Sequence, residues 1–281
     1  MNTGTPQGTD RFVRVGSLRL HYLEWGAPGV PAVVMVHGLT GNAHNFDLLA
    51  PAFLPAYRVL SLDVRGRGDS DWAQDADYTT RAYVGDLEGL RVALALERLS
   101  LIGTSMGGRI SLAYAGLYPQ RVERLVLNDI GPEVDPRGAA RIFGYVAEAP
   151  GRFQRLDEVA DWYHQNYPFL RGLGRQELLA YAGYAVRPDP AGGLTWKMDP
   201  AVRQALSRPQ PEDAWAWARA ITAPTLLIRG AESDILSPAI AHRMVAEMKS
   251  CRLAEVPGVG HAPSLAEPQA LSAIKELFGL A

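Results

Sequence analysis

The hexapeptide GTSMGG, at residues 103–108, is the stretch that decides the fold of this chain. It follows an apolar run from Leu99 to Ile102, which is typical of a buried strand, and it leads into a helical pattern over residues 106–117. Ser105 therefore lies on a sharp turn from a strand into a helix. The glycines on either side of the serine let neighbouring chain pass close to this turn, which projects the hydroxyl outward.

A serine in this position has the features of a nucleophile. The first turn of the following helix directs backbone N–H groups at the space beside the hydroxyl, where a negatively charged oxygen is stabilised. A glycine-rich turn with a capping serine produces the same short pattern, so the neighbouring sequence must distinguish a catalytic serine from a capping one. The strand before the serine and the helix after it favour the catalytic interpretation.

Apolar runs of strand length recur along the chain. Two alternating runs, at residues 12–15 and 18–22, are separated by Gly16 and Ser17 and predict a β-hairpin. Six further runs alternate with helical patterns, which predicts an α/β fold with a mostly parallel sheet of eight strands and helices on both faces. The six strands are expected at residues 32–36, 57–62, 99–102, 125–127, 225–228 and 251–256, and the helices at 44–53, 79–96, 106–117, 237–248 and 267–279.

One segment interrupts this alternation. Residues 131–222 contain no convincing buried strand and carry many of the aromatic residues of the chain. So long a stretch between consecutive strands suggests an inserted cap. We therefore expect a core formed by residues 11–130 and 223–281, and a mostly helical lid formed by residues 131–222. The aromatic side chains are expected to form a small core within the lid, and some of them to line a pocket.

A serine nucleophile needs a base, and His261 has the best position for one. It lies in GVGHAP, at residues 258–263, after the last predicted strand and before the last helix. Loops at the carboxyl ends of strands are where ligand-facing groups collect in open α/β sheets. Asp234 and Asp129 both follow strands and are candidates for the acid that orients the imidazole. We favour Asp234, and we keep Asp129 as a displaced acid or as a residue that shapes the entry into the lid.

The loop HGLTG, at residues 37–41, follows the first of the buried strands and reaches the same edge of the sheet. Its small and polar residues favour a tight loop. The backbone N–H of Leu39, together with that of Met106, is expected to hold an oxyanion. His37 is interpreted as a structural residue that stabilises the loop by hydrogen bonds.

Together these motifs resemble those of the α/β-hydrolase superfamily over nearly the whole chain, about residues 11–280. The matching segments are HGLTG, DVRGRGDSD at residues 63–71, GTSMGG, the loop around Asp234, and GVGHAP. The tripeptide at residues 67–69 matches a cell-adhesion motif, but its position inside the second of these segments makes it part of the family loop.

The resemblance implies a role for each candidate residue. Ser105 is the nucleophile, Asp234 the acid and His261 the base, and the N–H groups of Leu39 and Met106 form the oxyanion hole. It also implies that the insertion is the helical lid of the family. No cofactor is required, and no group of His, Cys and Asp residues has the sequence spacing of a metal site.

Within the superfamily, the serine at position 105 argues against haloalkane dehalogenases and epoxide hydrolases, which use an aspartate there. The SMGG form resembles esterases, enol-lactonases, carbon–carbon bond hydrolases and cofactor-free perhydrolases. The leading expectation is a carboxylic ester hydrolase that forms an acyl-enzyme from small, apolar esters or lactones. The alternatives are a carbon–carbon bond hydrolase of vinylogous diketones and a ligand receptor on a hydrolase scaffold.

The composition excludes several other classes. The chain has 281 residues, 47% of them hydrophobic, and a formal net charge of −2, which does not favour binding to nucleic acid or to an anionic membrane. No apolar run approaches the roughly 18 residues of a membrane span, and the first residues lack the apolar region of a secretory signal. Cys251 is the single cysteine, so no internal disulfide is expected. These features predict a cytoplasmic enzyme acting on a small molecule.

Overall fold

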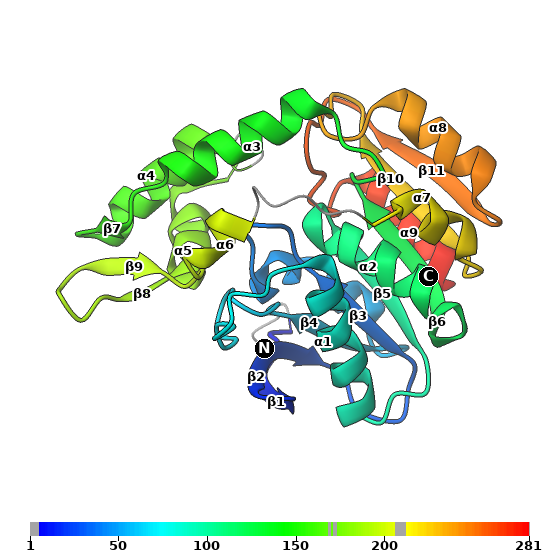
Figure 1. The fold of residues 1–281 in the computed structure, drawn as a ribbon, viewed down its shortest axis with the longest axis horizontal. Helices are drawn as coiled ribbons and strands as arrows, with labels where there is room; N and C mark the ends of the chain where they lie inside the picture. Colours follow the sequence, from blue (N-terminus) through cyan, green and yellow to red (C-terminus); the bar gives the residue numbers. More distant parts are fainter. Residues whose placement is uncertain (1–5, 168–169, 171–172, 206–211, 281) are drawn as a thin grey trace, which may run out of the picture.

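The computed structural model describes residues 6–167, 170, 173–205 and 212–280, and its core is an eight-stranded sheet (Figure 1). The strand order is β1-β2-β4-β3-β5-β6-β10-β11. The first two strands form the expected antiparallel hairpin, β2 also pairs antiparallel with β4, and the other neighbours are parallel. The expected α/β fold is confirmed. The strands are β1 (Thr9–Val15), β2 (Leu18–Trp25), β3 (Ala32–Val36), β4 (Arg58–Leu62), β5 (Leu99–Thr104), β6 (Val122–Asn128), β10 (Thr225–Gly230) and β11 (Cys251–Val256).

Helices cover both faces of this sheet. They are α1 (Thr80–Ala93), α2 (Met106–Leu117), α7 (Ala214–Ala220), α8 (Pro238–Glu247) and α9 (Pro268–Phe278). The short 3-10 helix η3 (Pro119–Arg121) connects α2 to β6. All of β3 is buried, and its side chains alternate between two cores. Val34 and Val36 pack in the core with α1, α2, α7 and α8, whereas Val33 and Met35 pack in the core with α9. Burial on both faces explains the continuous apolar runs in the sequence.

The single helix expected at residues 44–53 is replaced by two 3-10 helices, η1 (Ala43–Phe46) and η2 (Ala50–Phe53). Pro51 accounts for the break, because its nitrogen has no hydrogen to donate to the carbonyl of Asp47 in a continuous α-helix.

The segment from residue 131 to residue 222 contains more than helices. It holds α3 (Pro136–Glu148), α4 (Leu156–Asn166), α5 (Arg175–Ala185), α6 (Ala201–Ala205) and the strands β7 (Arg152–Phe153), β8 (Val186–Pro188) and β9 (Leu194–Trp196). These strands form a small antiparallel sheet in the order β7-β9-β8. Their two- and three-residue lengths explain why the sequence carried no strand signal. Figure 1 shows α3 running from the β10–α8 side of the molecule towards α4, with α5 and the small sheet gathered beyond it.

The last part of the segment belongs to the core. Helix α7 packs against α2. Its Trp215 and Trp217 are buried in the core that lies between the sheet and helices α1, α2 and α8. In this respect the structure differs from the expectation of a lid that extends to residue 222, because the helix before β10 already covers the sheet.

Aromatic side chains hold the outer part of the segment together. Tyr163 and Tyr167 are buried with ring centroids 5.0 Å apart, and the rings of Trp162 and Trp196 lie 5.3 Å apart in the same cluster. The expected small aromatic core of the segment is therefore present. In the described part of the chain, no helix is both long enough and apolar enough to span a membrane.

Candidate active site

Ser105 lies between β5 and α2 with a strained backbone, φ 54° and ψ −117°. Glycine is required two residues before and two residues after Ser105. A Cβ at Gly107 would lie 2.0 Å from the carbonyl oxygen of Val36, and a Cβ at Gly103 would lie 2.4 Å from the carbonyl oxygen of Gly107. The N–H of Ser105 donates to the carbonyl of Asn128 at 2.9 Å and ties the turn to the end of β6. The close packing predicted around this turn is therefore present.

His261 lies beside the serine. It follows β11, its side chain is 7% exposed, and its Nε2 is 2.8 Å from Ser105 Oγ. The other ring nitrogen, Nδ1, is 2.9 Å from Oδ2 of Asp129. The three side chains thus form one hydrogen-bonded chain from carboxylate to imidazole to hydroxyl, the arrangement that activates a serine.

Asp129 is held firmly at the end of β6. It is fully buried and has φ 56°, a left-handed conformation uncommon outside glycine. Its N–H donates to the carbonyl of Ile228 at 2.8 Å, and its Oδ1 accepts from the N–H of Gly230 at 3.2 Å. These contacts with β10 fix the carboxylate, so that its other oxygen faces His261.

Asp234 does not occupy the position expected for it. Its carboxylate accepts hydrogen bonds from Arg141 Nε at 2.6 Å and Arg141 Nη2 at 2.7 Å. The hydrogen bonds and charge of Arg141 hold the pKa of Asp234 below its usual value. The expectation that Asp234 orients His261 is wrong for this structure, because Asp129, kept as the alternative, makes that contact.

The loop at residues 37–41 lies next to the serine. A Cβ at Gly38 would be 3.6 Å from the Cβ of Ser105. Neither the N–H of Leu39 nor that of Met106 donates to a protein acceptor in the part of the chain that the structure describes. Both N–H groups thus remain available to an oxygen placed beside Ser105.

His37 stabilises this loop as expected. Burial lowers the pKa of its imidazole to about 4, so the ring is neutral at neutral pH. Nε2 accepts from the N–H of Val64 at 3.2 Å, and Nδ1 therefore carries the proton and donates to the carbonyl of Gly38 at 2.7 Å. That carbonyl shares a peptide group with the N–H of Leu39, so His37 fixes the direction of this N–H.

A cavity of about 240 Å³ opens over Ser105 and His261. Its walls come mainly from residues 37–48, from the inserted segment and from residues 261–264, and they combine a mostly apolar lining with several polar groups. Asn45 donates to the hydroxyl of Tyr181 at 3.1 Å, and burial raises the pKa of the Tyr145 hydroxyl to about 12. The polar side chains in the wall include Thr40, His44, Asn45, Arg141, Tyr145, Asn166, Tyr181 and Ser264.

The sequence offered no signal for this polar wall. Asn45 and Tyr181 are 136 residues apart and meet only because α5 lies across the cavity from η1. Arg141, Tyr145 and Asn166 also reach the cavity from the inserted segment. Their positions follow from the tertiary arrangement and from no local pattern.

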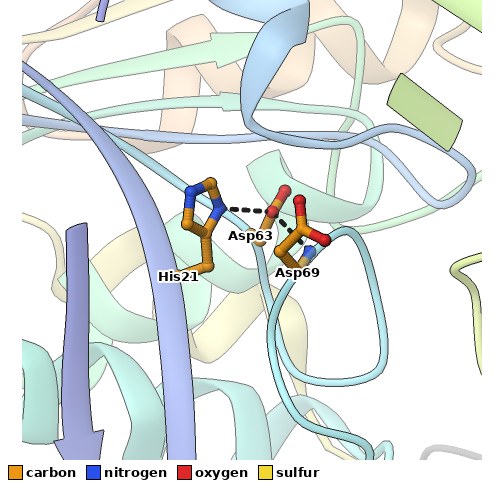
Figure 2. Close-up of side chains that lie close together, drawn as sticks. All are labelled: His21, Asp63 and Asp69. Atoms are coloured by element: carbon orange, nitrogen blue, oxygen red, sulfur yellow. Dashed lines mark hydrogen bonds and ion pairs between the residues drawn. The ribbon is translucent and has the colours of Figure 1, made fainter. Parts of the chain in front are cut away.

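A second group of polar side chains lies apart from this cavity. His21, Asp63 and Asp69 bring one possible ligand atom each to within 4.8 Å of one another (Figure 2). Sequence spacing did not reveal this group, because His21 comes from β2 and the aspartates from the loop after β4. A metal would have to displace existing partners. His21 Nδ1 and the N–H of Asp69 lie 2.7 and 2.9 Å from Oδ2 of Asp63, and Lys197 Nζ lies 2.7 Å from Asp69.

The second oxygen of Asp63 and the second ring nitrogen of His21 are also engaged. Oδ1 of Asp63 accepts from the N–H of Ala43 at 2.6 Å, and Nε2 of His21 lies 3.0 Å from Asp10. The group is therefore a hydrogen-bond network that ties β2 and the loop after β4 to η1.

Comparisons with known proteins identify the family to which this fold belongs. Residues 31–268 match the family model described as alpha/beta hydrolase fold. The chain is 36% identical over 276 residues to the 3-hydroxybutyrate-oligomer hydrolase of Cupriavidus necator, and the alignment covers 94% of each chain. It is 38% identical over 131 residues to the 2-hydroxy-6-oxononadienedioate/2-hydroxy-6-oxononatrienedioate hydrolase of Paraburkholderia xenovorans, with 44% of this chain and 45% of that protein covered. A crystal structure of an α/β hydrolase from Novosphingobium aromaticivorans superposes with a TM-score of 0.86 at 34% identity, covering 98% of this chain and 99% of the other.

Proposed function

This chain belongs to the α/β-hydrolase family, and we propose that it hydrolyses carboxylic esters with Ser105 as nucleophile, His261 as general base and Asp129 as the acid. The observation that carries the proposal is the unbroken hydrogen-bonded chain between these three side chains, with contacts of 2.8 and 2.9 Å, at the floor of a cavity. A hydroxyl next to a neutral imidazole can lose its proton as it attacks a carbonyl.

The reaction proceeds in two halves. As Ser105 Oγ attacks the carbonyl carbon, its proton moves to His261 Nε2, and the N–H groups of Leu39 and Met106 stabilise the negative carbonyl oxygen. Asp129 stabilises the resulting imidazolium, which then gives its proton to the departing alkoxide. Water, deprotonated by His261, attacks the acyl-enzyme, and His261 returns that proton to Ser105 Oγ as the C–O bond to the serine breaks and the acid leaves.

We propose short, oxygen-rich esters as substrates in place of the small, largely apolar ones first expected. Two features support this choice. The cavity wall carries phenol, amide and guanidinium groups that can hydrogen-bond to hydroxyl and carboxylate oxygens. The relative from Cupriavidus necator is named for oligomers of 3-hydroxybutyrate, which are linked by ester bonds and end in a free hydroxyl and a free carboxylate.

The inserted segment is proposed to act as a lid that selects the substrate. Ile142, Tyr145 and Tyr181 belong to it and line the same cavity as Ser105 and His261. A substrate placed at the serine would therefore contact α3 and α5. Changes in these helices should alter KM and substrate preference more than they alter the chemistry at the serine.

Carbon–carbon bond hydrolysis is a second candidate. The relative from Paraburkholderia xenovorans is named for a 6-oxo acid with no ester bond, so its hydrolysis must cleave a carbon–carbon bond. The same serine and histidine can serve that reaction. The partial alignment, which spans 44% of this chain, makes it the weaker candidate.

The test compares three substrates: a linear 3-hydroxybutyrate trimer, an apolar aryl butyrate and a 2-hydroxy-6-oxo-dienoic acid. We expect multiple turnovers and the highest kcat/KM on the trimer, with a phosphonate labelling Ser105 alone. The Ser105→Ala variant should lose activity by several orders of magnitude while staying folded. A preference for the oxo acid would support the second candidate. Binding without turnover would favour a receptor, and activity retained by Ser105→Ala would overturn the nucleophile assignment.

A further inference from the structure

We propose that Arg67 is a positioning residue of this reaction, a buried cation that holds both parts of the oxyanion hole and adds positive potential behind it. The inference rests on the proposed function and adds a residue to it. Arg67 does not line the large cavity above the serine, so it acts through its neighbours and not by touching the substrate.

The loop after β4 turns Arg67 inward. Gly66 and Gly68 both have left-handed backbone angles, with φ 73° and 51°. A Cβ at Gly68 would lie 2.1 Å from the carboxyl group of Asp63, so only glycine allows this turn. The result is a guanidinium that is 1% exposed, although arginine is rarely buried without a reason.

The contacts of Arg67 lead to the two residues that carry the proposed oxyanion donors. Its Nε donates to the carbonyl of Leu39 at 2.9 Å. Its Nη2 lies 3.6 Å from the sulfur of Met106. One side chain therefore holds the loop at residues 37–41 against the first residue of α2, which sets the distance between the two N–H groups.

The charge of this guanidinium has no paired carboxylate within the described residues. Its remaining contacts are neutral: Nη1 donates to the carbonyl of Arg65 at 3.2 Å and to the hydroxyl of Tyr83 at 3.1 Å. The ring of Tyr78 lies with its centroid 5.8 Å from the guanidinium carbon. A buried charge is normally paired, because its desolvation is otherwise uncompensated.

An unpaired buried cation favours negative charge that forms near it. The tetrahedral oxyanion is such a charge, and it is present in the transition state but not in the bound ester. Its stabilisation by Arg67 should therefore raise kcat and leave KM nearly unchanged. The hydrogen bond to Leu39 contributes separately, because it fixes the geometry of the donor loop before the reaction begins.

Arg109 offers a matched control. It lies one turn along α2, and it lines the same small cavity of about 60 Å³ as Arg67. Burial lowers the pKa of its guanidinium, as expected for a cation largely removed from water. No hydrogen bond connects it to Leu39 or to Met106 among the described residues, so the same substitution there removes a neighbouring charge without freeing the oxyanion loop.

The experiment uses the full-length enzyme and three substitutions at one position. Arg67→Gln keeps a donor for Leu39 without the charge, Arg67→Lys keeps the charge, and Arg67→Met removes both. We expect kcat on the preferred ester to fall by about ten- to a hundredfold in Arg67→Met, with KM within about twofold of wild type. Arg67→Lys and Arg67→Gln should each recover part of this loss, and Arg109→Met should stay within about threefold of wild type.

A second readout separates this role from general support of the fold. The affinity for a boronic acid that forms a tetrahedral adduct with Ser105 should fall by the same factor as kcat, whereas affinity for the acid product should not change. If kcat and the boronate affinity are unaffected in Arg67→Met, or if KM carries the whole loss, the inference is wrong. If Arg67→Met does not fold, Arg67→Gln and Arg67→Lys decide by the same criteria. Failure of the proposed function is distinct, because it would appear as activity that does not depend on Ser105.

Discussion

The carboxylate of Asp234 is bound by the guanidinium of Arg141 through two hydrogen bonds, and this pair joins the loop after β10 to α3 of the inserted segment. Both side chains are more than a third exposed, so the pair contributes less than about 1 kcal/mol to stability. The pair matters more for deciding which aspartate orients His261. Asp234 stands near enough to His261 to interact with its charge, but its hydrogen bonds are with Arg141, and the hydrogen bond to His261 Nδ1 comes from Asp129.

The first prediction separates the two aspartates. Asp129→Asn should reduce kcat by about 10⁴, because the amide cannot hold the proton-accepting tautomer of His261 or stabilise its cation. Asp234→Asn should change kcat by less than about tenfold, since it removes only a nearby charge. Steady-state kinetics on one ester tests both variants, with circular dichroism to show that they fold. The opposite order of severity would return Asp234 to the role of acid.

The two aspartates, Asp129 and Asp234, also show which part of the site could not be predicted from the sequence. Alternating strands and helices predicted the sheet, and GTSMGG and GVGHAP predicted that Ser105 and His261 meet at its carboxyl edge. Both aspartates follow strands that end at this same edge, so the strand pattern could not choose between them. The choice depends on the left-handed backbone of Asp129 and on two hydrogen bonds to β10, neither of which leaves a local signal.

The inserted segment was predictable only in outline. Its length and aromatic content indicated a separate covering element, and its aromatic core is present. Its strands of two or three residues are too short to produce an alternating pattern. The polar cavity wall depends on side chains such as Asn45 and Tyr181, whose partnership no local pattern encodes.

The second prediction concerns His37. Burial lowers the pKa of His37 to about 4 in the folded chain, against 6.5 in the unfolded chain. The unfolded state therefore binds more protons between these values, and stability should fall as the pH decreases from 6.5 to about 4, by a total on the order of 3 kcal/mol from this group. Above pH 6.5 the contribution is constant.

Urea unfolding at about pH 7 and about pH 5 measures this loss. His37→Gln should reduce the pH dependence, because glutamine does not titrate, whereas His242→Gln, at an exposed position of α8, should leave it unchanged. An unaltered pH dependence in His37→Gln would show that other groups control acid unfolding.

The third prediction concerns His21 and has the opposite sign. Burial alone lowers the pKa of His21, but the hydrogen bonds with Asp63 and Asp10 and the charges of Asp63 and Asp69 outweigh it and raise this pKa above 6.5. The folded state therefore favours the imidazolium. Its stabilising contribution is complete below pH 6.5 and is lost as the pH rises through the folded pKa.

We therefore expect His21→Gln to be most destabilising, relative to wild type, at about pH 5.5, and the difference to shrink by about pH 9. Unfolding by urea at both pH values tests this expectation. Figure 2 shows His21 beside Asp63, which also accepts from the N–H of Asp69. Asp63 accepts a further hydrogen bond from the N–H of Ala43. Such hydrogen bonds favour the ionised carboxylate, and its negative charge favours the imidazolium form of His21. A difference that grows with pH would mean that His21 is neutral in the folded chain.

The final prediction concerns substrate preference. Tyr181 reaches the cavity from α5, and its oxygen accepts from Asn45 Nδ2, which leaves its own hydrogen free to donate to a substrate oxygen. Tyr181→Phe removes this donor and leaves the ring in place. The ratio of kcat/KM for a 3-hydroxybutyrate ester to that for the unsubstituted butyrate ester should fall by about five- to fiftyfold, because a hydroxyl that loses its partner in the cavity is left unpaired.

The matched control is Tyr184→Phe on the same helix, whose ring stacks on His44 at 3.5 Å between centroids and which does not line the cavity. It should leave the ratio unchanged. Kinetics on the two esters with wild type and both variants gives the answer, since the unsubstituted ester lacks the hydroxyl that Tyr181 is proposed to bind and so serves as the reference. If the ratio is the same in all three proteins, Tyr181 does not recognise oxygen, and the polar wall of the cavity would have to act on another part of the substrate.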